Sequence, residues 1–339
     1  MTSKNSFKKE KEALSFDNQL PYVVYCEITN MCPFKCKICA WGQGLVKRHG
    51  SMTKDIFKKV VDEISLWEPK RSLGLYSMGE PLYHPMVFDY IRYAKSKGLR
   101  VFFATNASLL DREKQIKLAE SGIDELKISF EAEDPEIYEK IRVGGNYKDI
   151  LHNIQSFLRL LTKRNIKISI DILVIKYDEN ESLDVSEKFK NLFLSLYDVN
   201  FYSYHVANMN WKNNIQASLL RNKGYSSEPM RKVCPKFNDL VVSWDGKFRH
   251  CDLDFNDEYS SCSIENMSAK DFWFNENRRK ILEKMEKGDW GSIDLCKGCS
   301  APYTLSRRRR LYESKGKKVV LDKALHSYLF VDGRIADNL

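Results

Sequence analysis

The chain has 339 residues, of which 43% are hydrophobic and 30% are charged. That length allows about two domains, and that balance is typical of a globular protein and excludes a disordered or fibrous one. The 55 basic and 46 acidic residues leave a net charge of +9. This excess is too mild to indicate nucleic-acid binding, although it permits an anionic substrate.

The sequence contains no membrane or secretion signal. No apolar run approaches the ~20 residues that a membrane span requires, and residues 1–20 lack the apolar segment of a secretory signal. A cytoplasmic, reducing location is therefore expected. The nine cysteines would remain mostly thiols there, so clustered ones are interpreted as metal ligands rather than as disulfides.

Residues 21–208 alternate short β-branched or aromatic runs with amphipathic stretches. The runs predict six strands, at 22–29, 71–78, 100–106, 125–130, 167–176 and 200–207. The stretches predict helices at 53–67, 86–97, 111–121, 147–162 and 183–196. Successive βα units imply parallel strands with right-handed crossovers, so the predicted fold is an α/β, TIM-like partial (βα)6 barrel. Its chemistry is expected on the loops after the strands.

The pattern changes after residue 208. Residues 209–232 are polar and turn-rich, which predicts a connector. Two short strands joined by Asp245-Gly246 indicate a hairpin, and a helix over 269–287 and a Cys-x-x-Cys turn follow it. Residues 233–305 are therefore predicted to form a small α+β module. The basic segment 306–339 is interpreted as a solvated helix face, with a phosphate, nucleotide-sugar or acidic-peptide contact as the alternative.

Three cysteines follow the first predicted strand in the pattern Cys32-x3-Cys36-x2-Cys39. Three thiolates so close together can wrap one compact metal centre, and soft sulfur ligands select zinc or an iron–sulfur cluster. Three ligands leave one corner of a [4Fe–4S] cube open, as a catalytic site requires. A zinc knuckle, or three reduced thiols that lie close by chance, is the alternative.

This pattern, after the first strand of a βα-repeat chain, resembles the radical S-adenosylmethionine (SAM) family. Further stretches resemble that family in order at successive strand ends over residues 22–207: Gly79-Glu80-Pro81, Thr105-Asn106, and Ser129 with Arg142. The resemblance implies that Cys32, Cys36 and Cys39 hold three irons and that the amino and carboxylate groups of SAM chelate the fourth. It also implies that Gly79, Glu80 and Pro81 bind the methionyl amino group, and that Asn106, Ser129 and Arg142 contact SAM.

Two positions depart from the family pattern. Ile38 stands where an aromatic residue usually precedes the third cysteine, and it is expected to cover adenine by apolar contact. Ala107 replaces the glycine that usually follows Thr-Asn. The implied chemistry is reductive cleavage of SAM to a 5′-deoxyadenosyl radical that abstracts a substrate hydrogen. A reducing electron donor such as flavodoxin or ferredoxin is the implied partner.

A second group of four cysteines lies in the C-terminal module, at Cys234, Cys251, Cys296 and Cys299. On the residues alone it is equally a zinc ribbon. After a radical SAM barrel it resembles the SPASM and twitch domains, and four cysteines match the twitch form with one auxiliary [4Fe–4S] cluster. The implied duty of that cluster is electron transfer, with a purely structural role as the alternative.

Two cysteines remain outside these groups. Cys26 lies inside the first predicted strand, where a free cysteine usually packs in the core. Cys262 precedes the C-terminal helix, and it is the candidate hydrogen donor if the protein resembles the radical epimerases of this family.

The resemblance implies a radical SAM enzyme that oxidises a polar small molecule of the sugar or aminocyclitol type, with the auxiliary cluster as electron acceptor. Few residues precede the first strand, so no leader-binding domain is expected, which favours a small substrate. A redox-neutral epimerase and a maturase of a ribosomal peptide are the alternatives. A structural protein that holds zinc or iron–sulfur is the alternative outside catalysis. Neither nucleic acid nor a membrane is expected as a partner.

Overall fold

The computed structural model describes residues 19–176, 184–205, 233–260, 262–297 and 299, and the backbone of four strands between 307 and 335. The predicted connector 209–232 and nearly all of the predicted tail 1–20 lie outside the described residues. Side chains beyond residue 299 also lie outside them.

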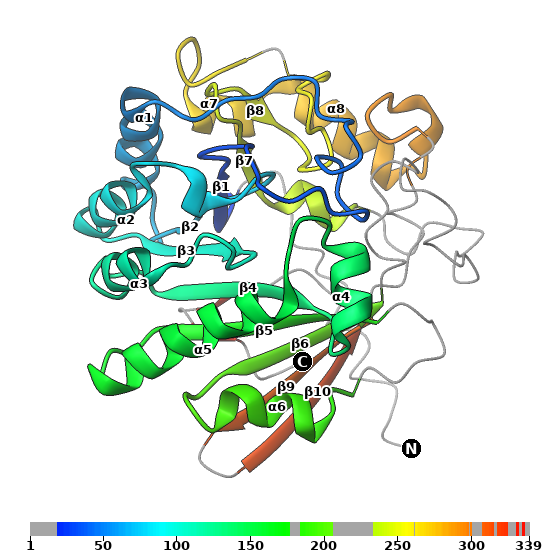
Figure 1. The fold of residues 1–339 in the computed structure, drawn as a ribbon. Coiled ribbons are helices and arrows are strands. Elements are labelled where there is room, and N and C mark those ends of the chain that lie inside the picture. Colours follow the sequence, from blue (N-terminus) through cyan, green and yellow to red (C-terminus); the bar gives the residue numbers. More distant parts are fainter. Residues whose placement is uncertain are drawn as a thin grey trace, which may run out of the picture.

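Six parallel strands in chain order form the curved centre of the molecule (Figure 1). Each strand pairs with the next along the chain. The strands are β1 (Val23–Cys26), β2 (Ser72–Gly74), β3 (Arg100–Thr105), β4 (Glu125–Glu131), β5 (Ser169–Lys176) and β6 (Asn200–His205). All six predicted strands are present, although β1 and β2 are shorter than predicted. Their order and direction confirm the predicted partial (βα)6 barrel.

The connecting helices cover the outer side of these strands (Figure 1). They are α1 (Lys54–Ile64), α2 (Val87–Ser96), α3 (Arg112–Ala119), α4 (Pro135–Ile141), α5 (Tyr147–Lys163) and α6 (Glu187–Leu194). Contacts join α1 to α2, α3 to α5 and α5 to α6, in the order of the strands that they connect. Five of these helices are predicted from the sequence, whereas α4, which is only seven residues long, is not.

Helix α1 shows how the sequence sets these elements. The side chain of Thr53 accepts the N–H of Ile56 at 3.3 Å, and this cap fixes the start of the helix as predicted. The helix face toward the sheet is apolar and fully buried, with Phe57, Val60, Val61 and Ile64. Burying a side chain of this kind contributes about 1.5–3 kcal/mol, so packing against the sheet holds the helix in place.

Four further strands extend the sheet to ten, in the order β10-β9-β6-β5-β4-β3-β2-β1-β7-β8. Strand β7 (Leu240–Val242) runs parallel to β1, and β8 (Phe248–Arg249) folds back on β7 through the predicted turn. The C-terminal module therefore begins inside the barrel sheet and continues it beyond β1.

At the other edge, β9 (Arg307–Ser314) pairs antiparallel with both β6 and β10 (Lys317–Ala324). The interpretation of this basic segment as a helix face is therefore wrong. The edge of β6 offers a row of unpaired backbone groups, and pairing with it outweighs the helix propensity of arginine. Strands β11 (Phe330–Val331) and β12 (Arg334–Ile335) form a separate pair.

Apart from these strands, the C-terminal module consists of short helices joined by turns. It contains η4 (Pro235–Asn238), α7 (Ala269–Trp273), α8 (Glu276–Glu286) and η5 (Trp290–Ser292). The single helix predicted over 269–287 is wrong, because the side chain of Asn275 accepts the N–H of Arg278 at 2.7 Å and starts a second helix. Glu63 of α1 accepts the N–H groups of Ala269 and Lys270 at 2.9 Å each, so α7 begins against a barrel helix.

Apolar side chains gather in one large cluster between the barrel strands and the outer helices. A second, smaller cluster lies within the C-terminal module. Among the described residues, no helix combines the length and apolar character needed to cross a membrane.

Candidate functional site

The loop after β1 carries the first three cysteines and is closed at its base by a side chain. Asn30 Nδ2 donates to the carbonyl of Arg48 at 2.6 Å, and Asn30 Oδ1 accepts the N–H of Gly50 at 2.9 Å. Within the loop, Gly42 packs on the backbone of Cys36, where a Cβ would lie 2.2 Å from the Cys36 carbonyl oxygen. These contacts fold the loop tightly around its cysteines.

Arg142 lies against the middle cysteine of this loop. Two backbone hydrogen bonds, of 2.8 and 2.9 Å, join the loop to residues 141–143 at the end of α4. Arg142 Nη1 then donates to Cys36 Sγ at 3.4 Å, and the guanidinium forms an ion pair with Glu131. Burial raises the pKa of the Cys36 thiol, and the charge of Arg142 opposes that rise. The guanidinium of Arg142, which follows α4, therefore lies beside the thiol of Cys36, which follows β1.

Glu131 belongs to the same group, although the sequence analysis does not predict it. It ends β4 at a bulge and has a φ of 65°, in the left-handed region that non-glycine residues rarely adopt. Three buried atoms here have no hydrogen-bond partner among the described residues: Glu131 Oε2, Tyr138 Oη and Arg142 Nε. Buried polar atoms normally have partners, so these three mark a place where a polar ligand fits. An acidic residue at a predicted strand end is the sequence signal that could have found it.

Glu80 is held at the end of the second strand by three hydrogen bonds. Its Oε1 accepts from Thr105 Oγ1 at 2.7 Å and from the N–H of Leu82 at 3.2 Å, and its Oε2 accepts from the N–H of Asn106 at 2.7 Å. Burial raises the pKa of this carboxyl to about 7, although the hydrogen bonds oppose the rise. The carboxylate therefore ties the ends of β2 and β3 together.

The turn before Glu80 lies on the cysteine loop. Gly79 has a φ of 79°, and a Cβ there would lie 2.5 Å from the carbonyl oxygen of Thr29, so this position requires glycine. The N–H of Glu80 donates to the carbonyl of Met31 at 2.9 Å, and Pro81 begins the turn η2 (Pro81–Tyr83). The predicted Gly79-Glu80-Pro81 motif thus lies directly beside the start of the loop.

The other residues predicted to contact SAM lie around the same edge. Asn106 Nδ2 donates to Cys32 Sγ at 3.6 Å. Ile38 is buried in the large hydrophobic cluster. Ser129 is half-buried in β4, and no hydrogen bond within the described part of the chain joins it to the cysteine loop. The structure thus brings Asn106 and Arg142 to the thiols and leaves Ser129 as a neighbour.

The second group of cysteines lies in the small hydrophobic cluster of the C-terminal module. All four are buried, at between 5% and 9% exposure: Cys234, Cys251, Cys296 and Cys299. Their apolar neighbours include Phe237, Leu282, Trp290, Ile293 and Leu295. Burial raises the pKa of the Cys234 thiol to about 11, and the charges of neighbouring cysteines contribute at Cys234 and Cys251. This group is therefore enclosed by apolar side chains, as a fully ligated metal site would be.

The two remaining cysteines lie apart from both groups. Cys26 is fully buried in β1, and burial raises the pKa of its thiol strongly. The carbonyl of Cys262 accepts the N–H of Phe248 at 3.0 Å, so Cys262 lies along the outer side of β8, at the end of the ten-stranded sheet. Its side chain packs against the large hydrophobic cluster.

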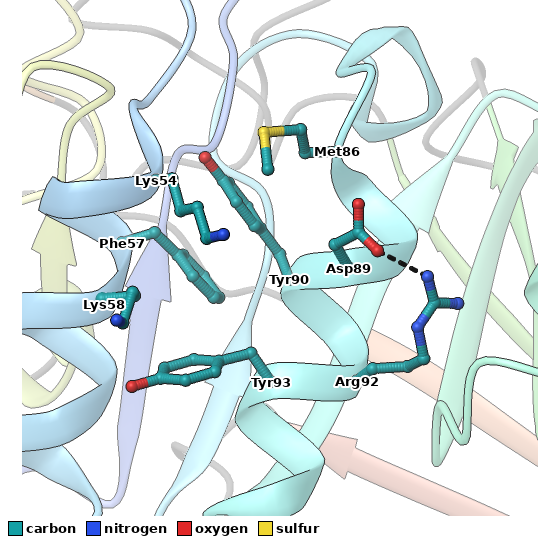
Figure 2. A pocket seen from close by; sticks show the side chains of 8 residues that line it. All are labelled: Lys54, Phe57, Lys58, Met86, Asp89, Tyr90, Arg92 and Tyr93. Carbon is teal, nitrogen blue, oxygen red and sulfur yellow. Dashed lines mark hydrogen bonds and ion pairs between the residues drawn. The ribbon is translucent and has the colours of Figure 1, made fainter.

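A pocket of about 500 Å³ lies between α1 and α2 on the outside of the barrel (Figure 2). Its lining residues are Lys54, Phe57, Lys58, Met86, Asp89, Tyr90, Arg92 and Tyr93. None of the predicted site residues lines it, so the strand ends and the cysteine loop, and not this pocket, form the candidate active site.

Comparison with known protein families agrees with this arrangement. The model of the radical SAM superfamily matches residues 26–188, and that of SPASM, an iron–sulfur cluster-binding domain, matches residues 234–300. The chain therefore contains a radical SAM domain followed by a SPASM domain. Radical SAM and SPASM domains bind SAM and [4Fe–4S] clusters, including an auxiliary cluster in the SPASM domain.

The relatives of this radical SAM chain carry several different names. An AdoMet-dependent heme synthase of Methanosarcina barkeri is 31% identical over 183 residues, which are 53% of this chain and 50% of the relative. A PqqA peptide cyclase of Rhodopseudomonas palustris is 30% identical over 130 residues, which are 37% and 32% of the two chains. The chain thus matches half or less of the length of these curated relatives.

Solved structures share the fold at low identity. The crystal structure of BtrN in complex with AdoMet and 2-DOIA has a TM-score of 0.52 at 18% identity, covering 82% of this chain and 92% of that one. Streptococcus suis SuiB bound to precursor peptide SuiA has a TM-score of 0.53 at 13% identity, covering 83% and 71%. At these identities the likeness shows the radical SAM fold alone.

The described residues fit the cofactors of the superfamily. Three thiols on a tight loop adjoin three unpartnered polar atoms, and four buried thiols share an apolar cluster. Within the described ranges no three His, Cys, Asp or Glu side chains stand in metal-binding geometry. Burial raises the pKa of Cys32 to about 12 and of Cys39 to about 11. Such buried thiols bind as thiolates only with a cation, which a cluster supplies.

Proposed function

We propose that this protein is a radical SAM oxidoreductase that dehydrogenates a polar small molecule of the sugar or aminocyclitol type. The observation that carries the proposal is the contrast between two groups of thiols. The three-thiol loop at the strand ends lies beside polar atoms that have no hydrogen-bond partner among the described residues, whereas apolar side chains enclose the four-thiol module. When bound, the clusters supply the electron that splits SAM and a place for the electron that leaves the substrate. A reduced flavodoxin or ferredoxin is the expected electron donor.

The residues at the strand ends would position SAM. Cys32, Cys36 and Cys39 are the expected ligands of the catalytic cluster. A carboxylate offers about four acceptor positions, and Glu80 uses three of them for neighbouring donors. The fourth is therefore left for the ammonium group of SAM. Arg142 is already paired with one carboxylate, and its Nε has no hydrogen-bond partner among the described residues, so this donor suits the carboxylate of SAM.

The inner face of the barrel supports a polar substrate. Leu126 and Ile128 of β4 pack in the large cluster, so the alternate residue Lys127 faces the concave side. In the sheet register Lys127 stands opposite Asp171, which accepts from Asn200 Nδ2 at 2.9 Å. An ammonium, a carboxylate and an amide thus lie on the inner face near the N-terminal ends of the strands, where Lys127 also pairs with Glu125 at 3.4 Å. A polar interior of this kind disfavours an apolar ligand.

The position of Cys262 favours oxidation over epimerisation. A thiol that returns a hydrogen atom has to face the substrate. Cys262 lies beside β8, and β7 separates β8 from β1.

In the closed module, Cys234, Cys251, Cys296 and Cys299 are the expected ligands of the auxiliary cluster.

Turnover in deuterated water separates the candidate reactions. Candidate polyols and aminocyclitols would be incubated anaerobically with the reconstituted protein, SAM and a reductant. Dehydrogenation predicts a carbonyl product without solvent deuterium and one 5′-deoxyadenosine for each product. One deuterium at carbon in a product of unchanged oxidation state would instead establish an epimerase. Turnover of peptides alone would establish the maturase that the likeness to PqqA peptide cyclase raises as the second candidate.

A further inference from the structure

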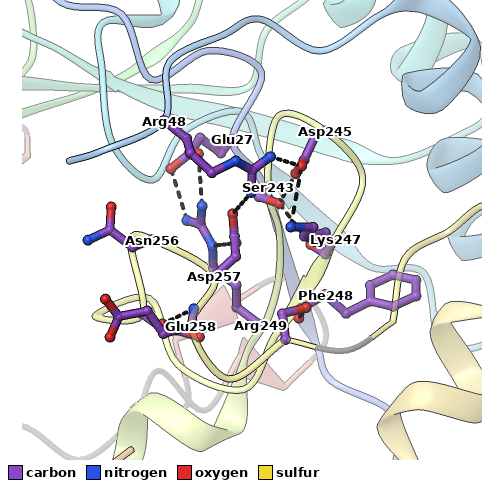
Figure 3. A network of polar contacts seen from close by, with 12 residues as sticks. Glu27, Arg48, Ser243, Asp245, Lys247, Phe248, Arg249, Asn256, Asp257 and Glu258 are labelled. Atoms are coloured by element: carbon purple, nitrogen blue, oxygen red, sulfur yellow. Dashed lines mark hydrogen bonds and ion pairs between the residues drawn. The ribbon is translucent and has the colours of Figure 1, made fainter.

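A buried charged network joins the C-terminal module to the residue that follows the first strand of the barrel (Figure 3). Arg249 lies in β8, two residues before Cys251, and its side chain has no solvent exposure. Its Nη1 and Nη2 donate to the two carboxylate oxygens of Glu27 at 3.0 and 3.1 Å, and its Nε donates to Asp257 at 2.5 Å. One guanidinium thus bridges two carboxylates from different parts of the chain.

Glu27 carries this contact to the predicted SAM motif. Its Oε2 also accepts the N–H of Met78 at 3.1 Å, and Glu27 itself is fully buried. Met78 directly precedes Gly79-Glu80, whose turn rests on the carbonyls of the cysteine loop. The backbone that enters the motif is therefore fixed by a carboxylate whose own position depends on Arg249.

Asp257 carries the second contact to the cysteine loop. It forms an ion pair with Arg48 at 3.1 Å, and the carbonyl of Arg48 accepts the side chain of Asn30 that closes the loop. The neighbouring Asn256 accepts from the N–H of Lys47 at 2.9 Å. The segment that follows Cys251 therefore contacts the same loop that carries the first three cysteines.

The chemistry of arginine explains why this residue occupies the centre of the network. A guanidinium has five donors in a rigid planar fork that matches a carboxylate, whereas the ammonium of lysine is a single point charge. Arg249 uses three nitrogens on two buried carboxylates. Lysine would keep the charge but could not hold Glu27 in two-point contact while also reaching Asp257.

We propose that Arg249 is a positioning residue through which the SPASM module sets the affinity of the barrel for SAM. Its contact with Glu27 holds the Met78 amide and with it the turn at Gly79-Glu80. The inference rests on the proposed SAM contact of that turn. It adds that a residue of the C-terminal module, outside the barrel and its motifs, controls the geometry of that contact.

The test compares Arg249→Lys with the wild type and with Arg278→Lys in the full-length chain. Arg278 is a matched control, because it is also a buried arginine of the module. It donates to the carbonyl of Phe237 at 2.8 Å, and its guanidinium carbon lies 3.6 Å from the centroid of the Trp273 ring. Hydrogen–deuterium exchange of the peptide around Met78 would be measured without metal. Iron content and the SAM dissociation constant would be measured after reconstitution.

We expect Arg249→Lys to speed exchange around Met78 and to raise the SAM dissociation constant about tenfold or more, with iron content unchanged. Arg278→Lys should leave both quantities at wild-type values. An iron-loaded Arg249→Lys that binds SAM as tightly as the wild type would overturn the proposal, and so would an equal loss in Arg278→Lys. If Arg249→Lys does not fold, Glu27→Gln takes its place under the same criteria, because it keeps the shape and weakens the same contact.

This outcome is distinct from a failure of the proposed function. If the protein is not a dehydrogenase, the wild type itself yields no oxidised product, whatever its affinity for SAM. Failure of the inference appears only as the absence of a difference between the wild type and Arg249→Lys in SAM binding.

Discussion

The two cysteine groups differ in what surrounds them. The first lies on a loop at the strand ends, beside buried polar atoms near Cys36 that have no hydrogen-bond partner among the described residues. The second is wrapped in apolar side chains, and all four of its thiols are buried. Open coordination and polar neighbours suit a site that binds a second ligand, whereas a closed apolar shell suits electron transfer or support. One chain thus places the same residue type in two different surroundings.

Removal of the first group should have the largest effect. The triple variant Cys32→Ala, Cys36→Ala and Cys39→Ala should reduce iron from about eight to about four per chain and bring SAM cleavage to background. The loop is held by Asn30 and Gly42 rather than by its thiols, so the variant should remain folded. Iron and sulfide analysis with zinc in parallel measures this. Unchanged iron would contradict the assignment of these ligands.

Removal of the second group should separate SAM cleavage from oxidation. Cys296→Ala with Cys299→Ala should also leave about four irons, yet 5′-deoxyadenosine should still form while the oxidised product is lost. The ratio of the two products, followed by chromatography, is the measurement. Oxidation that continues at the wild-type ratio would show that the auxiliary cluster is a structural brace.

Removal of one partner of the ion pair beside Cys36 should strongly reduce the free energy of unfolding. Arg142→Ala leaves the buried carboxylate of Glu131 without its cation and should reduce the free energy of unfolding by about 3–5 kcal/mol. The exposed pair of Arg92 with Asp89 provides the control, and Arg92→Ala should cost about 1 kcal/mol or less. Urea unfolding of the metal-free chains compares the two. Equal losses would mean that the Glu131 pair is not a buried one.

Much of the barrel was predictable because its strands and helices carry their signals locally. The apolar stripe of α1 and its Thr53 cap, the six strand runs and the Asp245-Gly246 turn are each set by neighbouring residues. The cysteine spacing likewise pointed to both groups. Nothing local indicated that β7 would pair with β1, because that contact joins residues more than 200 positions apart.

The same limit explains what the prediction missed at the site. Glu131 acquires its role from the return of α4 to the cysteine loop, and Arg249 acquires its role from the buried carboxylate of Glu27. Strand β9 was not predicted because it forms by pairing with the edge of β6. The composition of an arginine-rich segment does not indicate such pairing.

The carboxyl of Glu80 should make stability depend on pH. Its pKa rises from the ordinary 4.5 to about 7 in the folded chain, so the folded state holds a proton that the unfolded state has released. Below pH 4.5 this carboxyl makes its full contribution to the free energy of unfolding. That contribution, roughly 1–3 kcal/mol, is lost as the pH rises through about 7. Glu80→Gln should flatten that interval of the stability profile of the metal-free chain, measured by urea unfolding. Parallel profiles for the two proteins would contradict the raised pKa.

The smallest effect is expected where the chain departs from its family pattern. Ala107 has a φ of 60°, the conformation that explains the usual glycine, and its methyl group is fully buried. Ala107→Gly should relieve about 1–2 kcal/mol of strain but lose about 0.8 kcal/mol of burial and about 0.4–1 kcal/mol through the freer unfolded chain. These terms nearly cancel, so the free energy of unfolding should change by less than about 0.5 kcal/mol. Gly79→Ala is the counterpart, since its Cβ would strike the backbone of Thr29. A comparable loss in the free energy of unfolding in both variants would show that the neighbours of Ala107 pack favourably on its methyl group and offset the strain.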